Sequence, residues 1–226
     1  TPTLRGRFGA AAARIASESP GFVKFELRFA LTSSELVEQL RLHQINYAIV
    51  NADAIDQDRN SFHIAEVFED CIAWIVPTSV PLAAIKRALA ERPTTGLEGP
   101  LARYVEIDAN VSPRAKSDEW YRHHLPGAGP TFSANTYSMA VDMVAEGLAT
   151  THCPCSLLPN ISAADRSRLR VIPLRNFSRT MVLAVPKHLT TLPAYAHLFR
   201  RIIDFCRTDY QREMYVEEGE EMEEAV

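Results

Sequence analysis

The stretch VKFELRFALTSSELVEQLRLHQINYAIV, residues 23–50, decides the fold class. Its first part alternates between apolar and charged side chains, which predicts a β-strand with one buried face over 23–29. Thr32 and Glu35 then fit a capping box, with Thr32 as the N-cap of a helix. The apolar run 47–50 predicts a short strand of the kind found in buried parallel sheets. A strand, a helix and a strand within about 30 residues form a βαβ unit, so the sequence predicts an α/β protein.

The remainder of the chain continues to alternate between strands and helices, and it shows no internal repeat and no Gly/Ser-rich linker. Asn135 is expected to be the N-cap of a helix that ends before Gly147, and Ser112 is expected to cap a helix with Pro113 at its first position. Further strands are predicted at 71–77, 103–107, 131–134, 150–153, 171–174 and 181–185. A further helix is predicted at 82–91, the helix capped by Ser112 is expected to end at about 124, and a last helix near the C-terminus is expected to reach 206.

Length and composition exclude several classes of protein. A chain of 226 residues can bury about 70% of its surface, enough for one sizeable core or two small ones. With 9 Gly and 14 Pro it is neither collagen-like nor of low complexity. Its longest apolar run, 71–77, is too short to span a membrane, and no signal peptide is visible. We therefore expect a soluble protein that has no membrane partner.

The charge is unevenly distributed along the chain. The formal net charge is −4, but the last fourteen residues hold seven Glu and no Lys or Arg. The remainder has 24 basic and 21 acidic residues and no basic cluster of the kind that nucleic-acid binders carry. Residues 211–226 are therefore expected to form a solvated acidic tail.

Four cysteines are too few and too scattered for a disulfide framework, so reduced thiols in the cytoplasm are the expectation. Cys153 and Cys155 form a candidate redox pair, because Cys155 is expected near a helix N-terminus that favours the thiolate. The alternative is two small buried thiols. Zinc-type spacing is missing, so no metal and no cofactor are expected. Motifs for phosphate loops, dinucleotide binding, zinc proteases and serine hydrolases are also missing, and the chain is not expected to be an enzyme.

Four motifs in the expected order resemble the LysR-type transcriptional regulators. The stretch 33–50 is similar to the family pattern that ends in G-x-L-D-L-A-I, and VPTSVPLA at 76–83 is similar to its V-x-x-x-H-P-L-A. The stretch 135–159 is similar to the later pattern V-x-x-G-L-G-I-A-L-L-P, and 181–206 is similar to the closing strand and helix. The chain departs from the pattern at His43-Gln44-Ile45-Asn46, where the turn glycine and the acidic residue are missing.

The resemblance implies the effector-binding domain of such a regulator, without its DNA-binding helix-turn-helix domain. The implied fold class is α/β, two-lobed and like the type 2 periplasmic binding proteins, with mixed sheets, helices on both faces and two crossover strands as a hinge. The lobes would comprise 1–70 with 179–210, and 71–178. The family also implies a first strand before Thr1, a homodimer or homotetramer, and contact with DNA only through the missing domain.

The resemblance also implies a cleft between the lobes that holds a small-molecule effector. Three of the implied positions are expected helix N-caps, whose free N–H groups and positive dipole favour an anion, so a small anionic metabolite is the expected effector. The same residues could instead only cap helices, and Asn51 could be an ordinary turn residue. The implied ligand-binding residues are Thr1, Thr3, Thr32, Ser33, Asn51, Asn110, Ser112, Asn135 and Thr136.

Two functions remain for such a domain. The first is effector sensing in a cytoplasmic transcriptional regulator, in which the ligand biases the angle between the lobes. The second is delivery of a solute to a transporter by a binding protein of the same fold. The four cysteines and the regulator-like motifs favour the first function.

Overall fold

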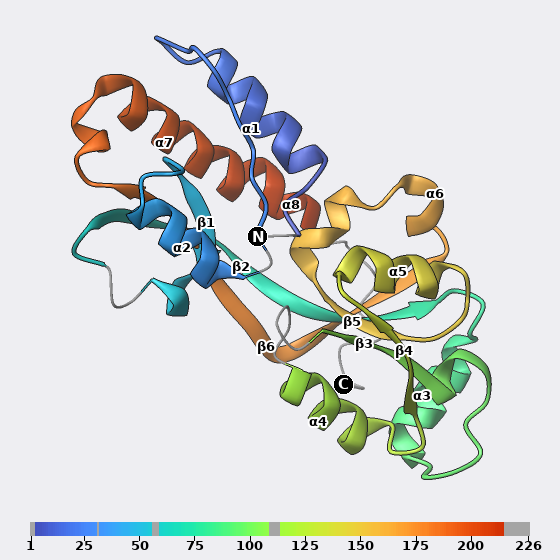
Figure 1. Ribbon diagram of the computed structural model, residues 1–226. Coiled ribbons are helices and arrows are strands. Elements are labelled where there is room, and N and C mark those ends of the chain that lie inside the picture. The colour runs from blue at the N-terminus through green and yellow to red at the C-terminus, as the bar shows by residue number, and fades with distance from the viewer. Residues whose placement is uncertain (1–2, 31, 56–58, 109–113, 215–226) are drawn as a thin grey trace. The chain divides into compact units, whose positions relative to one another are not determined.

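The computed structural model describes residues 3–30, 32–55, 59–108 and 114–214 (Figure 1). The chain falls into two compact units, with boundaries between Asp70 and Cys71 and between Phe177 and Ser178. It passes from the first unit to the second within one long strand and returns within another. These crossing strands are β2 (Phe62–Pro77) and β6 (Leu169–Pro186).

The first unit packs helices on both faces of a strand pair. β1 pairs antiparallel with β6, with Ala48 opposite Ala184 and Ile49 opposite Leu183. Because side chains alternate across a strand, Ala48 and Val50 join the core under α2, whereas Ile49 faces the other side of the sheet. The described elements of this unit are α1 (Arg7–Ser17), α2 (Ser33–Arg41), β1 (Ala48–Asn51), α7 (Pro193–Phe205) and α8 (Gln211–Met214).

The predicted strand at 23–29 is not a strand in the structure, which is a correction to the sequence analysis. The segment from Phe22 to Ala30 has no ladder partner within the described residues, and Val23 is 92% exposed. The segment crosses α1 at Gly9, where a Cβ atom would come within 2.6 Å of Leu27. An alternating pattern forms a strand only where another strand completes its hydrogen bonds, and here that partner is missing. β1 consequently has one neighbour, β6, and that neighbour is antiparallel.

The acidic tail begins later than the sequence indicated. Residues 206–210 form a π-helical turn that carries α7 into α8. Met214 is buried, and Glu213 forms an ion pair with Arg7 at 2.7 Å. These contacts account for the ordered helical turn at 211–214, and residues 215–226 lie outside the described part of the chain.

The second unit is built around a mostly aliphatic core that also holds three buried aromatic rings. β2 pairs antiparallel with β5, with Trp74 opposite His152, and β3 and β4 form a separate parallel pair. Trp74, Tyr104 and Tyr121 are buried together with Ile85 of α3. The described elements of this unit are α3 (Leu82–Glu91), β3 (Arg103–Ile107), α4 (Arg114–His124), β4 (Gly129–Ala134), α5 (Tyr137–Ala145), β5 (Thr151–Pro154) and α6 (Ala163–Arg166).

The crossing strands are joined by polar contacts at the edge of the first unit. Asp70, fully buried on β2, accepts two hydrogen bonds from the guanidinium of Arg179 on β6, at 2.8 and 3.1 Å. The neighbouring carboxylate of Glu69 accepts hydrogen bonds from the hydroxyls of Ser178 and Thr180. A buried charge is tolerated only when it is paired in this way.

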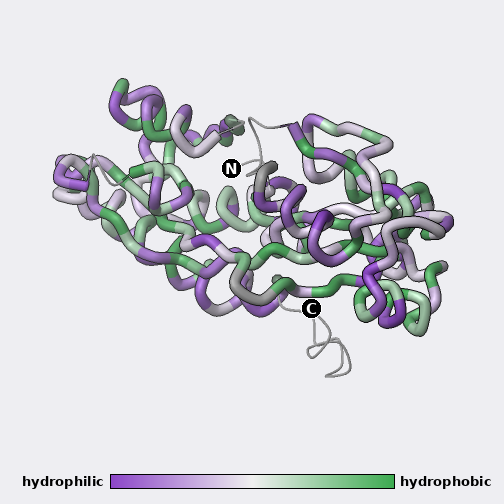
Figure 2. The backbone as a smooth tube through the Cα atoms, turned by 90° about the horizontal axis from the view of Figure 1, so that it is seen from below, coloured by the Kyte–Doolittle hydropathy of each residue, from purple (hydrophilic) through white to green (hydrophobic). Residues whose placement is uncertain are grey.

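Hydropathy alternates along the described part of the chain. Figure 2 shows hydrophilic and hydrophobic stretches following one another along the tube. Among the described residues, none of the helices combines the length and the apolar character that crossing a membrane would need.

Candidate functional site

The N-terminus of α2 brings together three of the residues that the sequence singled out. The hydroxyl of Thr32 accepts a hydrogen bond from the Glu35 N–H at 3.2 Å, so the predicted N-cap is confirmed. The hydroxyl of Ser33 accepts one from the Asn51 N–H at 3.0 Å, which ties the helix start to the end of β1. Asn51 in turn caps a short 3₁₀ turn by accepting from the Asp53 N–H. All three side chains are half-buried.

These hydroxyls keep a hydrogen that they can donate. A Ser or Thr hydroxyl that accepts from a backbone N–H still carries its own O–H donor. Within the described chain, the hydroxyls of Thr32 and Ser33 accept these hydrogen bonds and donate none. The helix N-terminus adds the positive end of its dipole. The arrangement can therefore bind a small anion through donated hydrogen bonds.

The second unit presents a similar helix start, at α5. Here the structure corrects the sequence analysis, because Thr136 and not Asn135 is the N-cap. The Thr136 hydroxyl accepts from the Met139 N–H at 3.2 Å, and its extended backbone is the conformation that an N-cap needs. Asn135 lies exposed one residue earlier, at the end of β4.

The structure does not place the remaining predicted ligand residues at the N-terminus of α2 or α5. Thr3 is 1% exposed and has partners of its own. Thr1, Asn110 and Ser112 lie outside the described residues.

The cysteines are paired differently from the expectation. Cys155 forms a disulfide with Cys71, across 84 residues of sequence and with Cα atoms 5.4 Å apart. The expectation of four reduced thiols is therefore wrong for this pair. Cys153 and Cys206 are buried and form no disulfide within the described chain, and burial raises the pKa of the Cys206 thiol to about 12.

A contact of the buried His152 in the second unit was not predicted from the sequence. The Nδ1 atom of His152 lies 2.6 Å from the hydroxyl oxygen of Ser117 on α4. The ring stacks on Tyr121 and meets Trp120 edge-on, and burial lowers the pKa of His152 to about 3. No signal in the sequence marked this contact, because it joins residues 35 apart.

This Ser–His contact is not arranged for nucleophilic catalysis. A general base works best with a pKa near the operating pH, and the pKa of His152 is far below it. A catalytic histidine also needs a group that orients its second nitrogen, and the Nε2 atom of His152 has no hydrogen-bond partner within the described chain. We therefore interpret the contact as part of the core. In the described ranges, no cluster of three His, Cys, Asp or Glu side chains could hold a metal ion.

The comparisons with known proteins identify the family. The model of the LysR substrate binding domain matches residues 4–208 of the chain. The chain belongs to this family. The α/β fold class that the sequence motifs implied, with its periplasmic-binding-protein-like organisation, is thereby confirmed. No curated protein matches the chain in sequence.

Solved LysR-type structures share the fold at low sequence identity. The OxyR2 regulatory domain from Vibrio vulnificus is 17% identical, with a TM-score of 0.62, over 91% of this chain and 92% of that one. The effector-binding domain of QuiR in complex with shikimate is 12% identical, with a TM-score of 0.59, over 92% and 94%. An OxyR variant from Corynebacterium glutamicum is 14% identical, with a TM-score of 0.61, over 94% of this chain but 63% of its own length. This LysR-family chain thus spans less than two thirds of that regulator.

Proposed function

We propose that the chain is the effector-sensing domain of a LysR-type transcriptional regulator in the cytoplasm. The observation that carries this proposal is the family match over residues 4–208, nearly the whole described chain. QuiR, which shares the fold, was solved with shikimate, a small carboxylate. The effector proposed here belongs to the same chemical class, a small anionic metabolite.

The proposed binding groups are the polar starts of two helices, one in each unit. Thr32 and Ser33 at α2 and Thr136 at α5 offer O–H and N–H donors to a carboxylate. With both units contributing, the ligand binds some arrangements of the units better than others. An effector shifts a conformational equilibrium only through such a difference in affinity.

The proposed output is a rearrangement of a homodimer or homotetramer. CbnR, a full-length regulator that shares the fold, was solved with its target DNA. In this chain, contact with DNA would be made by a separate N-terminal domain. The crossing strands β2 and β6 would act as the hinge between the units.

A ligand panel tests the proposal. Shikimate, other small carboxylates, sulfate and neutral sugars are each added to the purified chain, and the melting temperature is measured. A member of the anionic set at 100 times its Kd is expected to stabilise the fold by about 2.7 kcal/mol. The proposal is wrong if only the neutral compounds shift the melting temperature.

Variants at the helix caps then localise the site. Thr136→Val removes a donor and a cap, and it should weaken the effective ligand about tenfold or more. Ser162→Ala is the matched control, because Ser162 caps α6 by accepting from the Asp165 N–H at 3.1 Å and is no proposed contact. Equal losses of affinity in the two variants would contradict the proposal that the start of α5 contacts the ligand.

A further inference from the structure

The disulfide between Cys71 and Cys155 lies at the end of a strand ladder in the second unit. The antiparallel pairing of β2 with β5 ends where Ile72 lies opposite Pro154. Cys71 and Cys155 are the next residues on the two sides, and their Cα atoms are 5.4 Å apart. Residues directly opposite each other in an antiparallel pair have this separation. The bridge therefore extends the ladder by one residue pair.

The bridge holds the start of a buried turn in place. Cys155 is the first residue of the 3₁₀ turn Cys155–Asn160, whose residues Ser156, Leu157 and Leu158 are all less than 5% exposed. Pro154, the residue before the turn, has no N–H group that could bond to β2. The covalent bond thus ties the turn to β2 just beyond the last residue pair, and opening the bond should loosen this turn first.

The two cysteines of the bridge differ in their access to solvent. Cys71 is half-buried, whereas Cys155 is 1% exposed. Thiol–disulfide exchange begins when a thiolate attacks one of the two sulfur atoms, and its rate depends on access to that atom. A thiol from solution therefore attacks the Sγ atom of Cys71, and Cys155 is the leaving group.

The cytoplasmic location gives this difference in access a possible use. Disulfides of cytoplasmic proteins are usually transient and catalytic or redox-sensing, because glutathione keeps thiols reduced there. This step rests on the location in the proposed function, whereas the order of attack rests on the burial of the two cysteines alone.

We propose that Cys71 is a modification site at which a low-molecular-weight thiol, RSH, reversibly opens the bridge. The thiolate RS⁻ bonds to Cys71 Sγ, and the bond between Cys71 and Cys155 breaks, which leaves a mixed disulfide on Cys71 and a thiolate on Cys155. A second RS⁻ attacks the R-group sulfur of the mixed disulfide and releases Cys71 as a thiolate. The two RSH molecules supply two electrons and two protons, so the products are RSSR and two cysteine thiols. The reverse reaction, with RSSR as the oxidant, closes the bridge.

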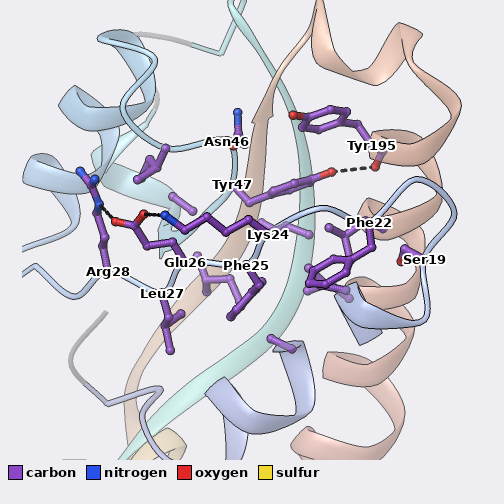
Figure 3. A pocket seen from close by; sticks show the side chains of 18 of the residues that line it. Ser19, Phe22, Lys24, Phe25, Glu26, Leu27, Arg28, Asn46, Tyr47 and Tyr195 are labelled. Atoms are coloured by element: carbon purple, nitrogen blue, oxygen red, sulfur yellow. Dashed lines mark hydrogen bonds and ion pairs between the residues drawn. The ribbon is translucent and has the colours of Figure 1, made fainter. Parts of the chain in front are cut away.

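The other two cysteines are closed to such a reagent. Cys153 and Cys206 are each 0% exposed. The first unit has a cavity of about 480 Å³, lined by the segment 22–29 and by Tyr195 of α7, among others (Figure 3). Among the described residues that line this cavity, none is a cysteine. A thiol that enters the first unit there meets no sulfur, so modification should be confined to Cys71.

The test uses the whole chain with glutathione as the thiol. The chain is incubated in buffers of graded GSH to GSSG ratio and quenched with acid, and mass spectrometry of its peptides locates the bridge and bound glutathione. We expect the bridge to open as GSH increases and to close again as GSSG increases. Glutathione should be found on Cys71 at least about tenfold more often than on Cys155. Amide hydrogen exchange at 155–160 should accelerate as the bridge opens, and exchange at 85–89 in α3 should not.

Two single variants form a matched pair for the order of attack. In GSSG, Cys155→Ala should take up glutathione on Cys71, whereas Cys71→Ala should leave Cys155 unmodified while the chain is folded. Circular dichroism confirms that each variant is folded, and the mapping on the parent chain does not depend on either variant.

Two results would overturn the proposal. The first is a bridge that GSH opens only after urea has unfolded the chain, because the disulfide would then be purely structural. The second is glutathione bound equally to Cys71 and Cys155 in the folded parent chain. Neither measurement uses an effector, so this proposal and the proposed function can fail separately.

Discussion

The two units differ in how completely they bury their apolar side chains. The second unit packs its aromatic rings against one another, with Tyr104 and Tyr121 stacked at 4.0 Å and Trp74 fully buried. The first unit leaves Phe22 and Val23 in solvent, beside a cavity and a free strand edge. Apolar composition alone therefore does not bury a segment. A segment is buried when a neighbouring element satisfies its backbone, and among the described residues no strand does so for 22–29.

The largest expected effect is on the free energy of unfolding, and it differs between a substitution in the second unit and one in the first. Trp74→Ala should lower the free energy of unfolding by about 3–5 kcal/mol, because it empties a fully buried site. Phe22→Ala in the first unit, where the ring is 44% exposed, should cost less than about 1 kcal/mol. Urea unfolding followed by circular dichroism measures both. Similar losses would remove the contrast between the units.

The disulfide should give the next largest effect. Replacing both Cys71 and Cys155 with Ala is expected to cost about 2–4 kcal/mol, because the bridge closes a long loop in the unfolded chain. Thermal unfolding with and without a reductant measures this cost. Cys153→Ala is the control, because Cys153 is not part of the disulfide. This variant should still be destabilised by the reductant, whereas the double variant should not. An unaltered response in the double variant would contradict the pairing.

The buried histidine predicts how stability depends on pH. Because the pKa of His152 is about 3 in the folded chain and 6.5 for a histidine in the unfolded chain, the unfolded chain binds a proton between these values that the folded chain does not. Stability is thus complete above pH 6.5 and falls as the pH falls, by roughly 2 kcal/mol between pH 6.5 and 5. His152→Phe should lose this part of the slope in urea unfolding. A slope equal to that of the parent chain would refute the assignment.

The smallest expected effect is at the exposed segment. Val23→Ser should change the free energy of unfolding by less than about 0.5 kcal/mol, because the side chain is 92% exposed. It should also reduce the binding of a hydrophobic dye, measured by fluorescence. A large loss of stability would show that the segment is packed, and the two units would then be more alike.

Local signals in the sequence predicted most of the elements. Thr32 was recognised as an N-cap because capping depends on residues within one turn. At α5 the cap lies one residue later than expected, since Asn135 and Thr136 are both suited to the position and only the backbone decides between them. The prediction of a strand at 23–29 was wrong because the alternating pattern is a local signal, whereas a strand also needs a pairing strand that can lie far away in the sequence.

The candidate site was harder to predict for the same reason. Three pairs of residues in contact are far apart in the sequence. The separation is 18 residues for Ser33 and Asn51, 35 for Ser117 and His152, and 84 for Cys71 and Cys155. No spacing rule in one sequence reports contacts at these separations. Capping signals in the sequence predicted the helix starts, whereas the expectation that they contact a ligand came from the resemblance to the LysR family, which carries information from the three-dimensional fold.

The bridge between Cys71 and Cys155 also determines how the molecule would behave under mechanical force. Pulling on the two ends of the chain can extend only the parts outside the bridge, so the 83 residues between the two cysteines stay within a closed ring. About 290 Å of contour length would remain hidden until the bond is reduced. Most of the second unit would thus be shielded from a load, which the first unit and residues 156–177 of the second unit would carry.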